Sequence, residues 1–173
     1  MLTQRDFSLT ALYTALDAQR RERTLTWQAT LANINALFGK TLARPISRAT
    51  VTGLATARVV EGDTALQLLR WLNRAPESFV EGCAPPLLAA AGLPVLPPDK
   101  LLRFDTARLH AALNESRTER GLSWTAAAAD IGGTTAGMLT TLAKGGRTSF
   151  PLVTRITGWL EQPAVAFTRV ADR

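Results

Sequence analysis

Residues 122–145 have the sequence LSWTAAAADIGGTTAGMLTTLAKG, and this stretch decides the fold that we expect for the chain. Ser123 is a typical N-cap residue and stands directly before an apolar run, which predicts a helix over 124–131. The glycine pair that follows predicts a turn, after which Thr134 or Thr135 can cap another helix. The stretch therefore predicts two short helices joined by a tight turn.

The chain contains this pattern twice, because its two halves repeat each other. A shift of 97 residues aligns the first part of each copy, and a shift of 88 residues aligns the rest. The aligned positions include Phe7 and Phe104, Leu12 and Leu109, Leu16 and Leu113, Arg20 and Arg117, Arg23 and Arg120, Trp27 and Trp124, Trp71 and Trp159, and Phe79 and Phe167. The difference between the shifts places nine extra residues in the first copy, where the turn at 37–45 is enlarged.

Apolar residues in each copy recur at helical spacing. Leu9, Leu12 and Leu16 lie three and four residues apart, and Thr26 precedes a second apolar run. The predicted further helices are 27–37, 47–56 and 66–72 in the first copy and 124–131, 135–144 and 153–160 in the second, with a short last turn after Pro76 and Pro163. Because no β-branched alternation of strand length occurs, we predict an all-α fold with four to five short helices per copy.

The limits of the repeats divide the chain into three parts. We expect a first helical domain over 1–80, a linker over 81–100 and a second helical domain over 101–173. The linker has five prolines, which exclude a long helix, and an apolar centre that a flexible tether would lack. We expect it to be semi-rigid and to pack partly against the repeats.

Charge and composition restrict the function. The net charge is +6 with a pI near 10.7, and 1–80 contribute +4 while 101–173 contribute +3. Positive charge in both halves favours an anionic partner. One cysteine, Cys83, and one histidine, His110, are too few for a disulfide or a zinc site, and we predict no cofactor. The N-terminus lacks an apolar signal core and no run is long enough to span a membrane, which predicts a cytoplasmic protein.

Both copies resemble one known family. The segment Leu-Ser-Trp-Thr-Ala-Ala-Ala-Ala-Asp-Ile-Gly at 122–132, followed by Thr135, Leu139 and Leu142, resembles the phage repressor/Cro (XRE-type) helix-turn-helix family. The first copy is similar through Leu25, Thr26, Ile34, Ser47, Val51 and Leu54. The resemblance covers about 70 residues in each half. It implies two tandem lambda-repressor-like helix-turn-helix domains that bind double-stranded DNA.

The resemblance also implies which residues read the DNA, because the helix after the turn lies in the major groove in this family. The candidates in the first copy are Ser47, Arg48, Ala49, Thr50 and Thr52. Of these, Arg48 can donate two hydrogen bonds to O6 and N7 of guanine. The candidates in the second copy are Thr135, Ala136, Gly137, Met138, Thr140 and Thr141. This second set is small and weakly polar, so we expect poor base reading by the second copy.

Other residues are candidates for phosphate contacts. Backbone N–H groups at helix N-termini favour anions, and cationic side chains attract them. The candidates are Thr26, Gln28, Lys40, Arg44, Arg58, Ser123, Thr125, Lys144 and Arg147. The hydroxyl residues among all these candidates can equally serve as helix caps alone. For Arg20, Arg23, Arg117 and Arg120 we prefer a solvated helix face to a binding role.

Enzymatic chemistry is weakly indicated. The segment Gly39-Lys40-Thr41 resembles the end of a phosphate-binding loop, but Ile34 stands where that loop needs its first glycine. No serine lies in a nucleophile elbow. His110 and the tryptophans are better explained as structural side chains. We therefore expect that the protein is not an enzyme.

The sequence predicts a sequence-specific, duplex DNA-binding transcriptional regulator. Its two units can form an intrachain pseudo-dimer whose subsites lie about 34 Å apart, or chains can form a homodimer in which the first copy alone reads bases. The alternative is a protein-interaction module, such as an antitoxin-like or phage accessory subunit, with the same fold and little specific DNA binding.

Overall fold

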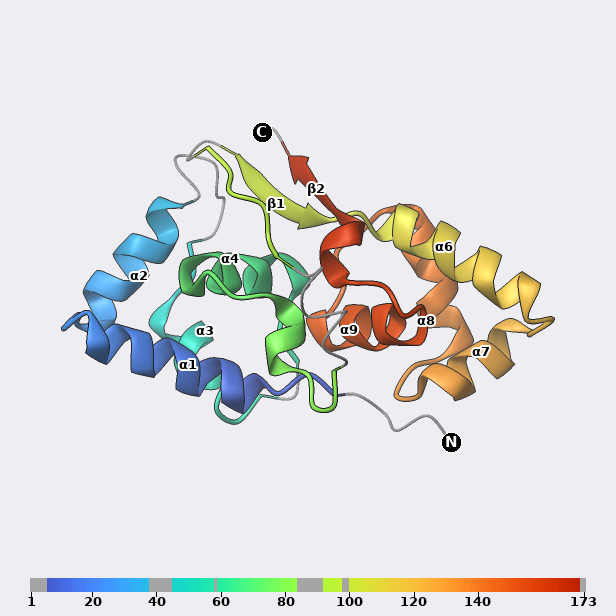
Figure 1. Ribbon diagram of the computed structural model, residues 1–173, viewed down its shortest axis with the longest axis horizontal. Helices are drawn as coiled ribbons and strands as arrows, with labels where there is room; N and C mark the ends of the chain where they lie inside the picture. Colours follow the sequence, from blue (N-terminus) through green and yellow to red (C-terminus); the bar gives the residue numbers. More distant parts are fainter. Residues whose placement is uncertain (1–5, 38–44, 58, 84–91, 98–99, 172–173) are drawn as a thin grey trace.

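The computed structural model of the chain describes residues 6–37, 45–57, 59–83, 92–97 and 100–171. The described chain is largely helical, and its two halves lie side by side (Figure 1). The first half contains α1 (Leu9–Glu22), α2 (Trp27–Ala36), α3 (Arg48–Gly53), α4 (Gly62–Leu72) and the 3-10 helix η2 (Pro76–Phe79). The second half contains β1 (Leu101–Phe104), α6 (Thr106–Glu119), α7 (Trp124–Ile131), α8 (Ala136–Thr141), the 3-10 helix η3 (Leu142–Lys144), α9 (Phe150–Trp159), the 3-10 helix η4 (Ala164–Phe167) and β2 (Thr168–Ala171).

The predicted cap residues begin the second and third helices of both copies. Each cap oxygen accepts a hydrogen bond from the backbone N–H three residues later, at 3.1–3.2 Å. The pairs are Ala29 N with Thr26 Oγ1, Thr50 N with Ser47 Oγ, Ala126 N with Ser123 Oγ, and Met138 N with Thr135 Oγ1. Of the two threonines that the sequence offered before α8, Thr135 is therefore the cap.

The third helices are shorter than predicted. α3 ends at Gly53 rather than near Thr56, and α8 ends at Thr141, although η3 continues the coil to Lys144. Glycine is a poor helix former, and the chain after Gly53 continues in turns, in which Ala57 N–H donates to Gly53 O at 2.7 Å. Each third α-helix thus has six residues, which is less than two turns.

A small antiparallel sheet corrects the prediction of a purely α-helical chain. β1 pairs with β2, and Phe104 lies opposite Thr168. The two strands are four residues long and far apart in the sequence, so no local alternation could reveal them. In the first copy, the bridge between Phe7 and Val80 occupies the equivalent place. The sheet is therefore an extended version of a contact that both copies make.

Arginines pack on tryptophans in the same way in both copies. The distances from guanidinium carbon to ring centroid are 5.0 Å for Arg20 on Trp27, 4.6 Å for Arg117 on Trp124, 5.1 Å for Arg23 on Trp71 and 3.9 Å for Arg120 on Trp159. A guanidinium on an aromatic face contributes to stability, so these four arginines have a packing role that the sequence analysis did not predict, although Arg23 and Arg120 remain exposed. His110 stacks on Trp124 as Tyr13 stacks on Trp27, which agrees with its predicted structural role.

The two copies meet at a local two-fold axis. Gly62 N–H donates to Thr148 O at 2.8 Å, and Phe150 N–H donates to Val60 O at 2.8 Å. Under the shift of 88 residues, Gly62 corresponds to Phe150 and Val60 to Thr148. Each hydrogen bond is therefore the symmetry equivalent of the other. α4 and α9 begin at this axis, and their two halves extend away from it in opposite directions (Figure 1).

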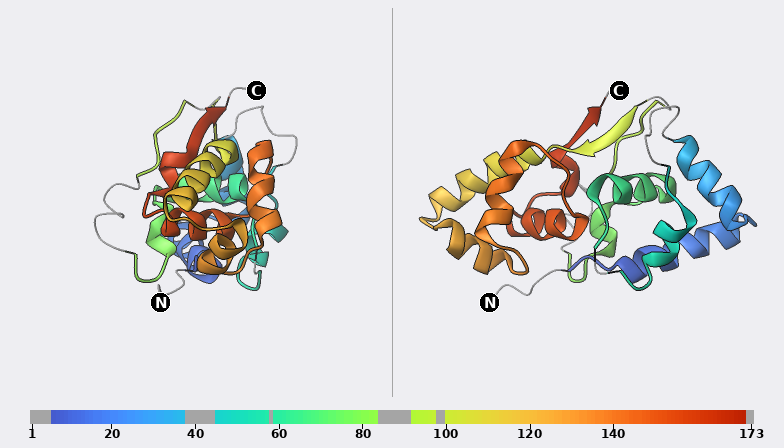
Figure 2. Two further views of the ribbon diagram at one scale, coloured as in Figure 1. Left: turned by 90° about the vertical axis from the view of Figure 1, so that its right-hand side faces the viewer. Right: turned by 180° about the vertical axis from the view of Figure 1, so that it is seen from behind.

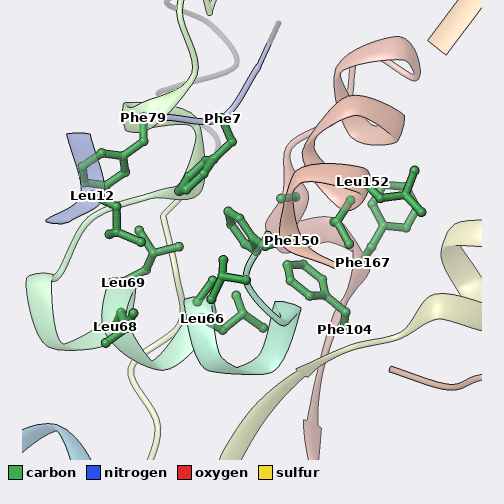
Figure 3. Close-up of a cluster of buried hydrophobic side chains, with 14 of the residues drawn as sticks. Phe7, Leu12, Leu66, Leu68, Leu69, Phe79, Phe104, Phe150, Leu152 and Phe167 are labelled. Carbon is green, nitrogen blue, oxygen red and sulfur yellow. The ribbon is translucent and has the colours of Figure 1, made fainter. Parts of the chain in front are cut away.

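One hydrophobic core runs through both halves. Phe7 and Phe104 occupy equivalent positions and both contact Phe150, with ring centroids 4.5 and 5.7 Å away (Figure 3). The largest fully buried side chains come from both copies: Leu12, Leu16, Ile34, Leu54, Leu66, Leu68, Leu69, Leu102, Leu109, Leu113, Leu139 and Phe150. The halves are thus joined by packing as well as by the linker.

The described part of the linker lies against this core. Leu93 and Leu96 pack on it, whereas Val95 is 97% exposed. Residues 84–91 and 98–99 lie outside the described residues. Within the part of the chain that the structure describes, every helix is too short or too polar to cross a membrane.

Candidate nucleic-acid interface

α3 and α8 are each packed on one side and open on the other. Val51 of α3 and Leu139 of α8, which are equivalent residues, are both fully buried. The described candidates on the outer side are all exposed except Ala136, which is half-buried: Ser47, Arg48, Ala49, Thr50, Thr52, Thr135, Ala136, Gly137, Met138, Thr140 and Thr141. The structure thus presents the sequence-predicted reading residues together on the outer surfaces of two short helices.

The outer surface of α3 offers one cationic side chain. Thr50 and Ser47 hydroxyls lie 3.0 Å apart, and Thr52 Oγ1 donates to Arg48 O at 2.9 Å, so the hydroxyl groups are engaged locally. Among the described residues, no carbonyl or carboxylate accepts a hydrogen bond from the Arg48 guanidinium. Arg48 can therefore bind an external acceptor without breaking a contact inside the described chain.

The outer surface of α8 is uncharged. Thr140 and Thr141 hydroxyls both donate to Gly137 O, at 3.1 and 2.7 Å, and Met138 is 47% exposed. Methionine offers polarisable apolar surface rather than hydrogen bonds. The two helices therefore differ in chemistry although they occupy equivalent positions.

The candidate cations are dispersed around these helices. Lys144 is exposed at the end of η3, and Arg147 pairs with Glu61 of the other half at 3.2 Å while its side chain stays 69% exposed. The polar candidates Thr26 and Gln28 of the first half and Ser123 and Thr125 of the second are exposed at the starts of α2 and α7. Lys40, Arg44 and Arg58 lie outside the described residues.

Two side chains that the sequence analysis missed fix the turns before α3 and α8. Asn35 holds Ile46 with two hydrogen bonds, from its Nδ2 to Ile46 O at 3.0 Å and from Ile46 N to its Oδ1 at 2.8 Å. In the second copy, Arg155 donates to Gly133 O at 3.2 Å and pairs with Asp6 of the first half at 2.8 Å. The sequence did contain a signal for Asn35, since it is an amide residue near the end of a helix and before a long turn. An amide side chain can both donate a hydrogen bond to a backbone carbonyl and accept one from a backbone N–H.

A cleft of about 980 Å³ runs beside α3 between the two halves. Thr50 of α3 and Leu54, the residue after α3, line it from the first half, and Arg103 of β1 lines it from the second. Asp63 also lines the cleft, and burial raises the pKa of its carboxyl, although the Phe104 N–H and Arg103 oppose this shift. The cleft leaves the flank of α3 that faces the second half accessible.

α3 and α8 lie at the same level along the local two-fold axis. A two-fold axis relates points at equal heights along itself, so equivalent helices lie at the same level of the molecule. The side view in Figure 2 agrees with this, because α3 and α8 lie near the same edge, on the side turned away in Figure 1. One partner surface can therefore meet both helices.

Comparison of the chain with models of protein families, with curated proteins and with solved structures finds no match in any of the three. The resemblance to the XRE-type helix-turn-helix family therefore remains a prediction that rests on the residues of this chain.

Proposed function

We propose that this protein is a sequence-specific, duplex DNA-binding transcriptional regulator that uses two tandem helix-turn-helix units of the XRE type. The observation that carries the proposal is the pair of capped, outward-facing helices, α3 and α8, each following another helix across a turn and each exposed on one side. Such a helix fits the major groove of B-DNA, which is about 12 Å wide. As a regulator of this kind the protein would act in the cytoplasm.

Arg48 is the main base-reading residue in this proposal. Its guanidinium stands exposed in the first turn of α3, where it can reach O6 and N7 of guanine with two donors. Ala49 and the methyl groups of Thr50 and Thr52 can contact thymine methyl groups. On α8, Met138, Ala136 and the methyl groups of Thr135, Thr140 and Thr141 offer apolar contacts of the same type, and Gly137 allows the backbone to approach closely.

Phosphate contacts then orient the two helices. Lys144 and Arg147 supply exposed positive charge beside α8, and Lys40, Arg44 and Arg58 belong to the same proposed set. Thr26 and Gln28 in the first copy, with Ser123 and Thr125 in the second, stand at helix starts where backbone dipoles favour anions. Each phosphate that is neutralised contributes about 0.9 to the slope of log affinity against log salt concentration.

The test is enrichment of random duplex DNA on the purified protein at two salt concentrations. We expect a defined motif that persists at the higher salt concentration. Arg48→Ala should remove a guanine from this motif and weaken binding about tenfold or more, because a bidentate contact contributes about 1–3 kcal/mol. Arg108→Ala on α6 removes the same charge from another exposed helix and is the matched control. Binding without a motif that vanishes at higher salt would contradict the proposal.

A second candidate function is a protein-interaction module, and the uncharged face of α8 with Met138 47% exposed favours it. Methionine-rich or apolar helix faces commonly dock onto other proteins. The double variant Arg48→Glu/Lys144→Glu separates the two functions. A DNA-binding protein loses its DNA affinity through charge repulsion, whereas a docking module retains its protein partner.

A further inference from the structure

The arrangement of the two copies restricts how DNA can be bound. We infer that one chain acts as an intrachain pseudo-dimer on a single inverted repeat whose two half-sites differ in sequence. This inference rests on the proposed function and specifies its substrate. It also excludes the homodimer arrangement, in which a second chain would supply the other half.

The inverted orientation follows from the local two-fold axis. The paired hydrogen bonds Gly62 N to Thr148 O and Phe150 N to Val60 O are symmetry equivalents, so one half is turned by about half a revolution relative to the other. A DNA duplex has its own two-fold axes, perpendicular to the helix, which exchange its two strands. When the two axes coincide, α3 and α8 read opposite strands in opposite directions. The subsites are then inverted rather than direct repeats.

Both helices can engage the same duplex because they lie on one face (Figure 2). Successive major grooves on one side of B-DNA lie about 34 Å apart, so we expect half-site centres about one helical turn apart. The axis passes between the starts of α4 and α9, which places it between the two reading helices. The centre of the inverted repeat should therefore carry no direct base contact from α3 or α8.

Several contacts between the halves hold this orientation. The buried Gln67 of α4 donates to Leu102 O of β1 at 3.0 Å, and Ala164 N–H donates to Glu77 at 2.6 Å. Phe150 fills the space between Phe7 and Phe104 at the axis (Figure 3). The surface that a second chain would need for the same two-fold contact is thus occupied by the other half of the same chain.

The half-sites differ because the reading positions differ. Under the shift of 88 residues, the outward positions of α3 align with those of α8 as Arg48 with Ala136, Ala49 with Gly137, Thr50 with Met138 and Thr52 with Thr140. A charged double donor therefore faces one half-site, and apolar surface faces the other. The first half-site should contain a specified guanine. The second half-site should specify fewer base pairs and should favour thymine, whose methyl group α8 can contact.

The experiment determines the symmetry of the enriched DNA and the number of chains bound to it. We expect two unlike, inverted half-sites about one helical turn apart, and one chain per duplex in sedimentation of the complex. Reversing one half-site in this duplex should lower the affinity at least tenfold. A direct repeat, a single half-site or two chains per duplex would overturn the inference and leave the proposed function standing. Absence of any enriched motif would overturn the proposed function, and the inference with it.

A variant that makes the reading helices alike provides the sharper test. Ala136→Arg, Gly137→Ala and Met138→Thr together give α8 the outward residues of α3 and leave the buried Leu139 unchanged. A Cβ at Gly137 would have Thr135 Oγ1 at 3.9 Å as its nearest neighbour, so the site has room for it. The enriched motif should change to a symmetric inverted repeat of the first half-site.

The reciprocal variant, Arg48→Ala with Ala49→Gly and Thr50→Met, should give a symmetric motif of the second half-site. This reciprocal variant replaces the first one in the test if circular dichroism shows that the first variant does not fold. A variant that folds, binds DNA and keeps the unequal parental motif would overturn the assignment of the two half-sites to α3 and α8.

Discussion

Arg20 joins three groups of the first copy through one guanidinium. It pairs with Asp17 at 2.7 Å, donates to Leu25 O at 2.8 Å and lies 5.0 Å from the centroid of Trp27. Arg117 repeats the backbone bond and the stacking in the second copy, at 2.6 Å to Leu122 O. A planar fork of donors can make these contacts together, whereas the single ammonium of lysine cannot.

We expect Arg20→Lys to lower the free energy of unfolding by about 1–2 kcal/mol, because it removes a stacked and hydrogen-bonded guanidinium. Arg117→Lys should have a similar effect. The matched control is Arg21→Lys, since Arg21 also pairs with Asp17 but its side chain is 73% exposed, and its effect should stay within about 0.5 kcal/mol. Urea unfolding measures all three. Equal losses for Arg20→Lys and Arg21→Lys would refute a role for the stacking.

Glu77 is a buried acid at the contact between the halves. One carboxylate oxygen accepts the hydrogen bond from Ala164 N at 2.6 Å, and the other is buried without a partner among the described residues. Burial raises the pKa of Glu77, although the backbone hydrogen bonds oppose this shift. The folded protein therefore holds the proton of Glu77 more tightly than the unfolded chain does.

Because this pKa is raised on folding, the stabilisation by Glu77 is complete below its unfolded pKa of about 4.3 and is lost as the pH rises through the folded pKa. Glu77→Gln mimics the protonated acid and should remove this dependence. Relative to the parent, we expect the variant to gain stability as the pH rises from 4 to 7, because the parent alone loses the contribution of the protonated acid. Urea unfolding at three pH values tests this. A difference between variant and parent that is constant with pH would show that Glu77 does not titrate in this range.

The turn between α2 and α3 depends on Asn35. Its amide replaces two backbone partners for Ile46, directly before the cap of α3. Asn35→Ala should destabilise the protein by about 1–3 kcal/mol, because two backbone groups lose their partner. The neighbouring Asn33→Ala, at an exposed position of the same helix, is the control and should be nearly neutral. Thermal unfolding of both variants checks this, and similar losses in both would argue against the clamp.

The same variant tests whether Asn35 positions α3 for DNA. If it does, the half-site assigned to α3 should lose sequence information in Asn35→Ala while the half-site assigned to α8 keeps its own. A uniform loss over both half-sites would indicate general destabilisation instead.

The starts of these helices were predictable because a cap is local. Ser123 and Thr135 each bond a backbone N–H three residues away, and the apolar run that follows marks the direction of the helix. The same holds for the exposure of Arg48, which directly follows the cap residue Ser47 in the first turn of α3. Local sequence signals were thus sufficient to predict the helices that form the candidate interface.

Contacts between distant parts of the chain were not predictable in this way. The four-residue strands β1 and β2 are stabilised by pairing with each other and by contact with α4. Neither strand therefore has a local sequence pattern that predicts it. The stacking of the arginines of α1 and α6 was not predictable because their tryptophan partners lie on other helices. The relative orientation of α3 and α8 likewise depends on the hydrogen bonds at the two-fold axis.

The whole molecule is expected to unfold as one unit, since its core is continuous between the copies. Phe150 of the second half packs on Phe7 of the first, and Gln67 of the first binds Leu102 beyond the linker. Exposing the core of one half would therefore remove packing from the other.

Substitutions at equivalent core positions can test this cooperativity. Leu12→Ala and Leu109→Ala each truncate a fully buried leucine and should cost about 2–5 kcal/mol. In a background with Trp27→Phe and Trp71→Phe, the remaining tryptophans, Trp124 and Trp159, report on the second half alone. Leu12→Ala should then lower the midpoint of the fluorescence transition as much as it lowers that of circular dichroism. A fluorescence midpoint that stays unchanged would mean that the halves unfold independently, and the fixed orientation of α3 and α8 would lose its support.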